Sequence, residues 1–288
     1  MQRFLRFLPA ALLAAILMSV GLLSTAVAAD KPTIKIGYVQ SWPSSDITTH
    51  LAGAVIEQRL KNPVELVASS AGPMWEAVAS NHSDAMLTAW LPSTHKTYYE
   101  KLWSKVVIMG PNVTGTRLGI AVPNYVPMDT IEDLKKNADK FQNRVVGVGA
   151  GAGININTEK AIKAYGLDGF SLQTSSTAAM TAQLQRAIKS KQWIAVTAWT
   201  PMWMWAKFDI KFLKDPKHIY GKGGYIGTVV NPALAKKSPE VYAFFNRFAI
   251  PREELSQMML KVKNGKDMNQ VVEDWIKAHP KMVDSWVS

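Results

Sequence analysis

The sequence predicts an α/β fold of two similar lobes, each a mainly parallel sheet flanked by helices, with two hinge strands crossing between them. Three observations predict it. Apolar strands and amphipathic helices alternate from Thr33 onward, and the alternation starts again near Arg144. The pattern Thr-Ala-Trp-x-Pro also occurs twice, at Thr88 and, 109 residues later, at Thr197. A repeat of that length is far too long for a solenoid and suits two related α/β units.

The first unit has the order β-α-β-α-β. A β-branched strand is expected from Thr33 to Val39, and a helix with one apolar face from Asp46 to Leu60. A second strand follows at Val64 to Ala68, a helix begins near Gly72, and a buried strand is expected at Ala85 to Ala89. Strands separated by helices predict parallel pairing.

The second unit repeats this arrangement. We expect a strand from Arg144 to Val148, helices from Thr158 to Tyr165 and from Ser175 to Lys189, and a buried strand from Trp193 to Ala198. Each Thr-Ala-Trp strand is therefore preceded by a helix and a short polar turn.

Two glycine-flanked, β-rich stretches, residues 115–122 and 223–230, are suited to cross between the lobes, because small residues absorb the backbone change of a hinge. Three amphipathic helices follow, beginning near Val241, Leu255 and Met268, and we expect them to complete the first lobe. The predicted boundaries place residues 30–116 and 224–288 in lobe 1 and residues 117–223 in lobe 2.

Residues 1–29 have the pattern of a cleaved signal peptide: Arg3 and Arg6 precede an apolar run that ends at the small residues Ala26-Val27-Ala28. A retained membrane anchor is the rival interpretation. Cysteine is absent, which excludes disulfides and a lipid-modified cysteine. We therefore expect a freely diffusing periplasmic protein. Its lysines are scattered among acidic residues, so the formal net charge of +11 does not indicate nucleic-acid binding.

Catalytic motifs are missing from the sequence. There is no nucleophile elbow, no His-Glu-x-x-His and no phosphate-binding loop, so we expect a protein that is not an enzyme and needs no cofactor. The histidines have no metal-ligand spacing, so no metal site is expected; they are His50, His82, His95, His218 and His279.

Tryptophan is the unusual residue, with ten copies. Trp42, Trp90 and Trp199 each stand where an apolar strand gives way to a loop, the edge at which open α/β sheets bind ligands. Indole faces turned toward one cleft would suit a quaternary ammonium ion, which offers no N–H group. The glycines from Gly147 to Gly153 precede a helix, whose first amides favour an anion such as a carboxylate; a plain strand-to-helix turn is the alternative.

These residues resemble a family, the glycine betaine-binding proteins of osmoprotectant ABC transporters. The matching stretches are Ala71-Gly-Pro-Met-Trp75, Leu87-Thr-Ala-Trp-Leu-Pro-Ser-Thr-His95, Gly151-Ala-Gly-Ile154 and Thr197-Ala-Trp-Thr-Pro-Met-Trp203. The resemblance covers nearly all of the mature chain and implies the two-lobed, type II-like periplasmic-binding-protein fold.

The resemblance also implies the site. Trp90 and Trp199 would belong to a cage around the trimethylammonium group, His95 would donate to the carboxylate, and the amides of Gly153 and Ile154 would complete the anion site. Trp42 would be the third cage residue, although this sequence has an extra residue before it and Pro43 after it.

The expected function is capture of glycine betaine in a cleft between the lobes and delivery to a membrane permease by a monomeric binding protein. The permease is implied by the resemblance alone. The alternatives are another quaternary ammonium solute, such as choline, carnitine, proline betaine or trimethylamine oxide, an exported enzyme acting on such a compound, or an osmolyte-sensing receptor.

Overall fold

The structure, a computed structural model, describes residues 31–149 and 152–288. The expected signal peptide, residues 1–29, and Gly151 of the glycine-rich stretch lie outside the described residues. No helix in the described part of the chain has both the length and the apolar character needed to cross a membrane.

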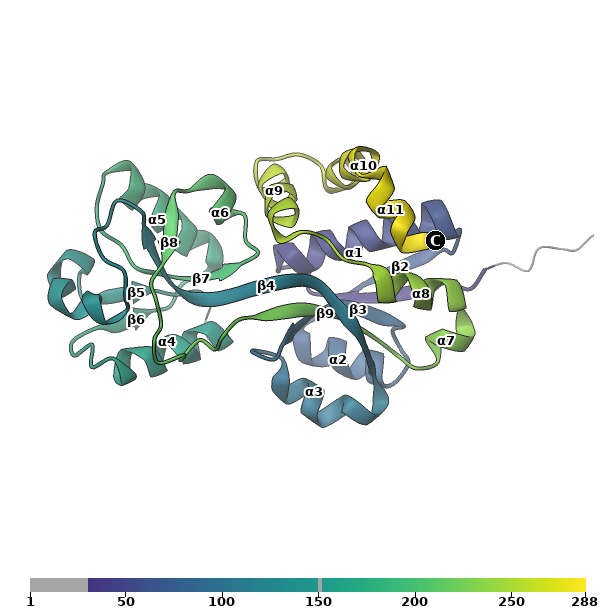
Figure 1. The fold of residues 1–288 in the computed structure, drawn as a ribbon, viewed down its shortest axis with the longest axis horizontal. Coiled ribbons are helices and arrows are strands. Elements are labelled where there is room, and N and C mark those ends of the chain that lie inside the picture. The colour runs from purple at the N-terminus through teal and green to yellow at the C-terminus, as the bar shows by residue number, and fades with distance from the viewer. Residues whose placement is uncertain (1–30, 150–151) are drawn as a thin grey trace, which may run out of the picture. The chain divides into compact units, whose positions relative to one another are not determined.

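In the described residues five strands form the sheet of the first lobe, and one of them continues into the second lobe. Figure 1 shows their arrangement. Strand β1 (Ile34–Tyr38) pairs in parallel with β2 (Val64–Ala68) and with β3 (Ala85–Leu91), and β9 (Gly224–Val230) lies antiparallel beside β3. The β-α-β-α-β order predicted from the sequence is confirmed here, and β2 has the predicted bounds. Every residue of β3 is buried, as its continuous apolar run indicates.

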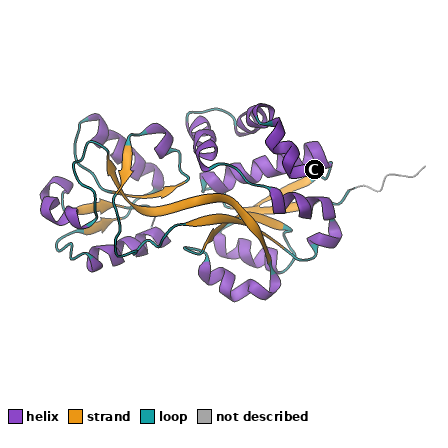
Figure 2. Cartoon of the chain, viewed as in Figure 1, coloured by secondary structure: helices purple, strands orange, loops and turns teal. Residues whose placement is uncertain are grey.

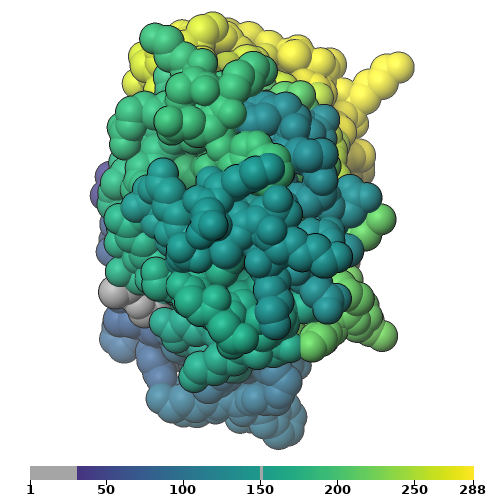
Figure 3. Space-filling model, turned by 90° about the vertical axis from the view of Figure 1, so that its left-hand side faces the viewer, coloured from purple at the N-terminus to yellow at the C-terminus, as the bar shows by residue number. Residues whose placement is uncertain are grey.

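The second lobe carries a smaller set of strands. Strand β5 (Arg144–Val146) pairs in parallel with β6 (Ser171–Gln173) and with β7 (Val196–Thr200). Strand β8 (Ile210–Phe212) pairs antiparallel with residues 121–123, the end of a long strand that enters from the first lobe. Figure 3 faces the end of this lobe, and the surface toward the viewer there is formed by residues from the middle of the chain, teal and green in the picture.

One long strand belongs to both sheets. Strand β4 (Val107–Pro123) pairs with β9 through Thr116 and with β7 from Arg117 onward. The sequence predicts only residues 115–122 as a crossing strand, because Pro111 interrupts the apolar pattern. In the structure Pro111 lies within the strand, next to a position where the pairing register with β9 shifts, and proline is accepted at such irregularities. We propose lobe boundaries at 116/117 and 223/224 because the pairing changes partner there.

Helices cover the sheets of both lobes (Figure 2). In the first lobe α9 and α10 pack against α1, so the chain after β9 returns to the lobe in which it began. Within the described residues this lobe contains α1 (Pro43–Val55), α2 (Ala71–Ala79), α3 (Lys96–Leu102), α7 (Leu234–Lys237), α8 (Pro239–Arg247), α9 (Arg252–Lys263), α10 (Met268–Ala278) and α11 (Pro280–Val287). The second lobe contains a 3-10 helix (Glu132–Phe141), α4 (Gly153–Ala164), α5 (Thr177–Lys189) and α6 (Met204–Lys207).

Several sequence predictions in the second lobe are wrong in their limits. The strand expected from Arg144 to Val148 ends at Val146. The helix expected to begin at Thr158 begins at Gly153, since glycine and asparagine in its first turn are weak helix formers and hide its start. The strand expected from Trp193 to Ala198 is Val196–Thr200. Trp193 precedes this strand, and its ring packs on Phe141 with ring centroids 5.4 Å apart. Trp193 is therefore partly buried by a contact outside the sheet, which made it look like a strand residue in the sequence.

Candidate functional site

The first Thr-Ala-Trp-x-Pro motif ends β3. Trp90 is 7% exposed and pairs with Ile226 of β9. The peptide between Leu91 and Pro92 is cis, and the chain turns so that the amide of His95 donates to the Trp90 carbonyl at 3.0 Å. This turn places the His95 side chain next to the end of the strand.

The second motif ends β7 in the corresponding way. Trp199 is half-buried and pairs with Leu118 of β4, and the peptide between Thr200 and Pro201 is again cis. The indole of Trp205 donates to the Trp199 carbonyl at 2.7 Å. The two copies therefore share a strand, a terminal indole and a cis-proline exit, one copy in each lobe.

Trp42 lies in the first lobe between β1 and α1, at the residue just before α1 begins. Its amide donates to the Val39 carbonyl at 3.0 Å, and its carbonyl accepts from the Asp46 amide at 3.0 Å, so the backbone is fixed on both sides. Its half-buried indole lies 5.7 Å from the His95 ring, centroid to centroid.

His95 is the most deeply buried polar group of the predicted set, at 2% exposed. Burial lowers the pKa of its imidazole to about 4, because an imidazolium ion would lose its hydration there. The ring is therefore neutral at ordinary pH. A neutral imidazole has one N–H group, which makes it a donor to an anion without placing a net positive charge beside an ammonium group.

The start of α4, where the sequence predicts the amide donors Gly153 and Ile154, lies against the turn that follows β3. A Cβ atom built on Gly153 would lie 3.1 Å from the Thr94 methyl group, so the helix start lies directly against the residue before His95. Ile154, 5% exposed, follows in the first turn. The amides at the N-terminus of a helix attract anions, and α4 runs for 12 residues.

Asn155 braces the loop that leads into α4. Its side chain accepts from the Val148 amide at 3.2 Å and donates to the carbonyls of Val148 and Gly149 at 3.0 Å each. A Cβ on Gly147 would lie 2.8 Å from the Asn155 oxygen, so glycine is needed for this close approach. Gly147 thus has a packing reason to be glycine.

The predicted residues are joined only in part. Contacts connect Trp42 with His95, and Gly153 with the neighbour of His95. In the described ranges no ring pair includes Trp90 or Trp199, so the three-indole cage stays a prediction. Trp75 of α2, which the sequence did not assign to the site, contacts His95: its indole N–H donates a hydrogen bond to the His95 ring. The Ala-Gly-Pro-Met-Trp stretch contained Trp75, without indicating its partner.

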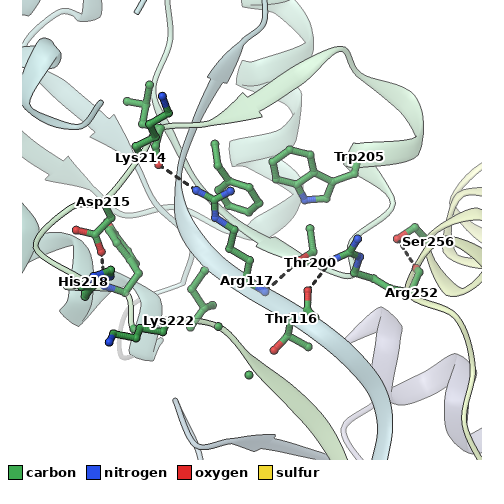
Figure 4. Close-up of a pocket in the computed structure, with 18 of the residues that line it drawn as sticks. Thr116, Arg117, Thr200, Trp205, Lys214, Asp215, His218, Lys222, Arg252 and Ser256 are labelled. Carbon is green, nitrogen blue, oxygen red and sulfur yellow. Dashed lines mark hydrogen bonds between the residues drawn. The ribbon is translucent and has the colours of Figure 1, made fainter. Parts of the chain in front are cut away.

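A broad depression of about 1350 Å³ lies elsewhere, along β4 between Thr200 and α9 (Figure 4). None of the predicted site residues lines it. Its cationic side chains would repel a quaternary ammonium ion, and its two carboxylates are engaged: Asp215 accepts from Tyr165, and Glu253 pairs with Arg252. The basic lining residues are Arg117, Lys214, Lys222 and Arg252.

The described residues contain no group of three or more acidic or histidine side chains placed to hold a metal ion. The two α/β lobes are joined by the long strand β4 and by the chain that returns to the first lobe at the start of β9. With tryptophans at the strand ends, a neutral buried histidine and a helix N-terminus, this arrangement defines a two-lobed solute-binding protein. The chain belongs to the family described as the substrate-binding domain of ABC-type glycine betaine transport systems, whose model matches residues 32–278.

Solved structures support the fold. The chain is 35% identical to lactococcal OpuAC in its closed conformation with glycine betaine, with a TM-score of 0.81, over 90% of this chain and 100% of that one. It is 34% identical to the glycine/betaine/L-proline-binding protein of Borrelia burgdorferi, with a TM-score of 0.79, over 89% of this chain and 97% of that one. The predicted two-lobed periplasmic-binding-protein fold is confirmed.

A curated relative is the glycine betaine/carnitine transport binding protein GbuC of Listeria monocytogenes. It is 44% identical over 162 residues, which are 56% of this chain and 53% of that protein. The match thus spans about half the length of that relative. The family consists of substrate-binding proteins and not of enzymes.

Proposed function

We propose that this protein captures glycine betaine between its lobes and delivers it to the permease of an ABC transporter. The observation that carries the proposal is His95, a buried, neutral donor whose ring lies beside the Trp42 indole and whose neighbour Thr94 lies against the α4 N-terminus. This combination matches a zwitterion, with aromatic faces for the ammonium end and N–H donors for the carboxylate end.

In the proposed complex Trp42, Trp90 and Trp199 surround the trimethylammonium group. His95 and the amides of Gly153 and Ile154 hold the carboxylate. Neither lobe supplies all of these groups, so the ligand binds best when the lobes are together and shifts the population toward that form. The closed form is then the one that docks on the permease, and the mature chain acts as a monomer in the periplasm after removal of residues 1–29.

Rough energies agree with simple binding. Each desolvated cation–π contact is worth up to about 2 kcal/mol, and each hydrogen bond to a charged group about 1.5 to 3 kcal/mol. Ordering and lobe closure offset several kcal/mol of the total. A dissociation constant of about 1 μM, or about −8 kcal/mol, is therefore expected.

Another quaternary ammonium solute is the second candidate. Choline has the cation but no carboxylate, so it would leave the His95 donor and the α4 amides without their anion; we expect it to bind more weakly than glycine betaine. Carnitine, proline betaine and trimethylamine oxide test the space around the cation. The name of the Listeria relative mentions carnitine beside glycine betaine, so carnitine is the most informative solute to compare with glycine betaine.

Calorimetric titration of the purified mature chain with these solutes tests the proposal. The expected result is tightest binding of glycine betaine, near micromolar, with the ligand recovered chemically unchanged. Tighter binding of choline than of glycine betaine would contradict the assignment of the carboxylate site, and a chemically altered ligand would favour an enzyme.

A further inference from the structure

The Trp75 side chain makes the polar contact on the buried side of His95. Trp75 lies on α2, has no exposed surface, and its indole nitrogen Nε1 is 3.2 Å from His95 Nδ1. An indole N–H can only donate. The hydrogen bond therefore requires His95 Nδ1 to be the acceptor, which means that Nδ1 carries no proton.

This contact decides where the single proton of the neutral ring resides. With Nδ1 unprotonated, the proton is on Nε2, the nitrogen at the far side of the ring from Trp75. Within the described part of the chain Nε2 has no hydrogen-bond partner, so its N–H group is available to a ligand. If the proton were on Nδ1, two N–H groups would face each other at 3.2 Å, and Nε2 would offer a lone pair to an anion.

Aromatic packing fixes the plane of the same ring. Tyr98 approaches it edge-on with centroids 5.6 Å apart, Trp42 lies at 5.7 Å, and Trp75 itself at 6.1 Å. A ring enclosed on three sides can turn over only by breaking the Trp75 hydrogen bond. Orientation and proton position thus depend on one side chain.

We propose that Trp75 is a positioning residue that holds His95 as the Nε2–H tautomer, with that N–H group directed toward the carboxylate of the ligand. The inference rests on the proposed function for the identity of the ligand, but the tautomer itself is a property of the protein without ligand. A partner that orients a ligand-binding histidine through its second nitrogen is a general device, seen also at metal sites.

Trp75→Phe tests it, because phenylalanine keeps an aromatic ring in α2 and removes only the N–H group and part of the packing. The matched control is Trp275→Phe: Trp275 is 3% exposed, and its indole donates to Glu254 at 3.2 Å, on α10 and away from the site. Both variants lose one indole hydrogen bond in the first lobe, a buried one at Trp75 and a part-buried one at Trp275.

The first readout is nitrogen-15 NMR of the histidine rings without ligand, with the His95 signals identified by their loss in His95→Phe. We expect the wild type and Trp275→Phe to show a protonated Nε2 and an unprotonated Nδ1. Trp75→Phe should show a mixture of the two tautomers. A protonated Nδ1 in the wild type, or an unchanged pattern in Trp75→Phe, would overturn the proposal.

The second readout is calorimetry with glycine betaine, for which Trp75→Phe should bind roughly three- to tenfold more weakly, the loss of about one hydrogen bond. Trp275→Phe should bind as the wild type does, and equal weakening in both variants would overturn the proposal. Should the wild type not bind glycine betaine while its tautomer still depends on Trp75, the proposed function fails and the positioning role stands.

Discussion

Replacing Trp199 by alanine is expected to lower the affinity for glycine betaine about thirtyfold while the chain remains folded. A cation–π contact in a desolvated site is worth about 2 kcal/mol, and 1.4 kcal/mol corresponds to a factor of ten. Trp199 is half-buried, so truncation removes a wall of the cleft and not a core side chain. Its carbonyl, which accepts from Trp205, is retained by alanine. Calorimetry gives the affinity, and circular dichroism checks the fold.

Trp193→Ala is the matched control. It removes a half-buried indole from the same lobe, three residues before β7 begins, where the ring packs on Phe141 and under the Lys140 ammonium group. It should leave the affinity unchanged. Equal affinity of Trp199→Ala and the wild type would contradict a cage that includes Trp199.

Trp90→Ala is also expected to weaken glycine betaine binding at least tenfold, but it is a less clear test of the cage than Trp199→Ala. Trp90 is 7% exposed in β3, and removing a buried tryptophan costs about 3 to 5 kcal/mol of stability. An effect of Trp90→Ala on binding would therefore mix loss of the cage with loss of folded protein.

Replacing His95 by phenylalanine is expected to weaken glycine betaine binding roughly ten- to a hundredfold and to leave choline binding nearly unchanged. Phenylalanine keeps a ring between Trp42 and Tyr98 but has no donor, so one hydrogen bond to the carboxylate, about 1.5 to 3 kcal/mol, is lost. Calorimetry with both ligands measures the ratio of their affinities. An equal loss for both ligands would show that His95 does not contact the carboxylate.

The pH profile of the wild type provides a check on the same residue. Because the pKa of His95 is lowered to about 4, the ring is neutral from about pH 6 upward, and the affinity should be constant from about pH 6 to about pH 9. A histidine with the ordinary pKa of about 6.5 would change its charge within that range. A steep fall in affinity as the pH rises through that range would mean that the site requires an imidazolium ion.

Much of the fold follows from local sequence patterns. β2 is predicted end to end because a short β-branched run is bounded by proline and by serine. β3 is predicted in place but too short, since the expected strand ends at Ala89 and β3 continues to Leu91. The three-residue strands β6 and β8 were not predicted, because a segment of that length shows no periodicity and forms only when its partner strand is present. The sequence also under-predicted β4, whose two halves belong to different sheets.

The candidate site divides in the same way. Trp90 and Trp199 could be chosen from their places at the ends of predicted strands. Gly153 was chosen through the family resemblance, because the sequence pattern placed the start of this helix at Thr158. The hydrogen bond from Trp75 to His95 could not be predicted, because it joins two elements and depends on how α2 packs against the turn after β3. Local patterns indicate which residues stand at an edge, whereas the partner of each side chain is decided by tertiary packing.

A crystal structure of the mature chain with glycine betaine tests the central claim most directly. The account predicts the trimethylammonium group among the indoles of Trp42, Trp90 and Trp199. The carboxylate should lie within hydrogen-bond distance of His95 Nε2 and of the amides at the start of α4. A ligand bound in the basic depression beside Arg117, or a carboxylate that does not reach His95, would contradict it.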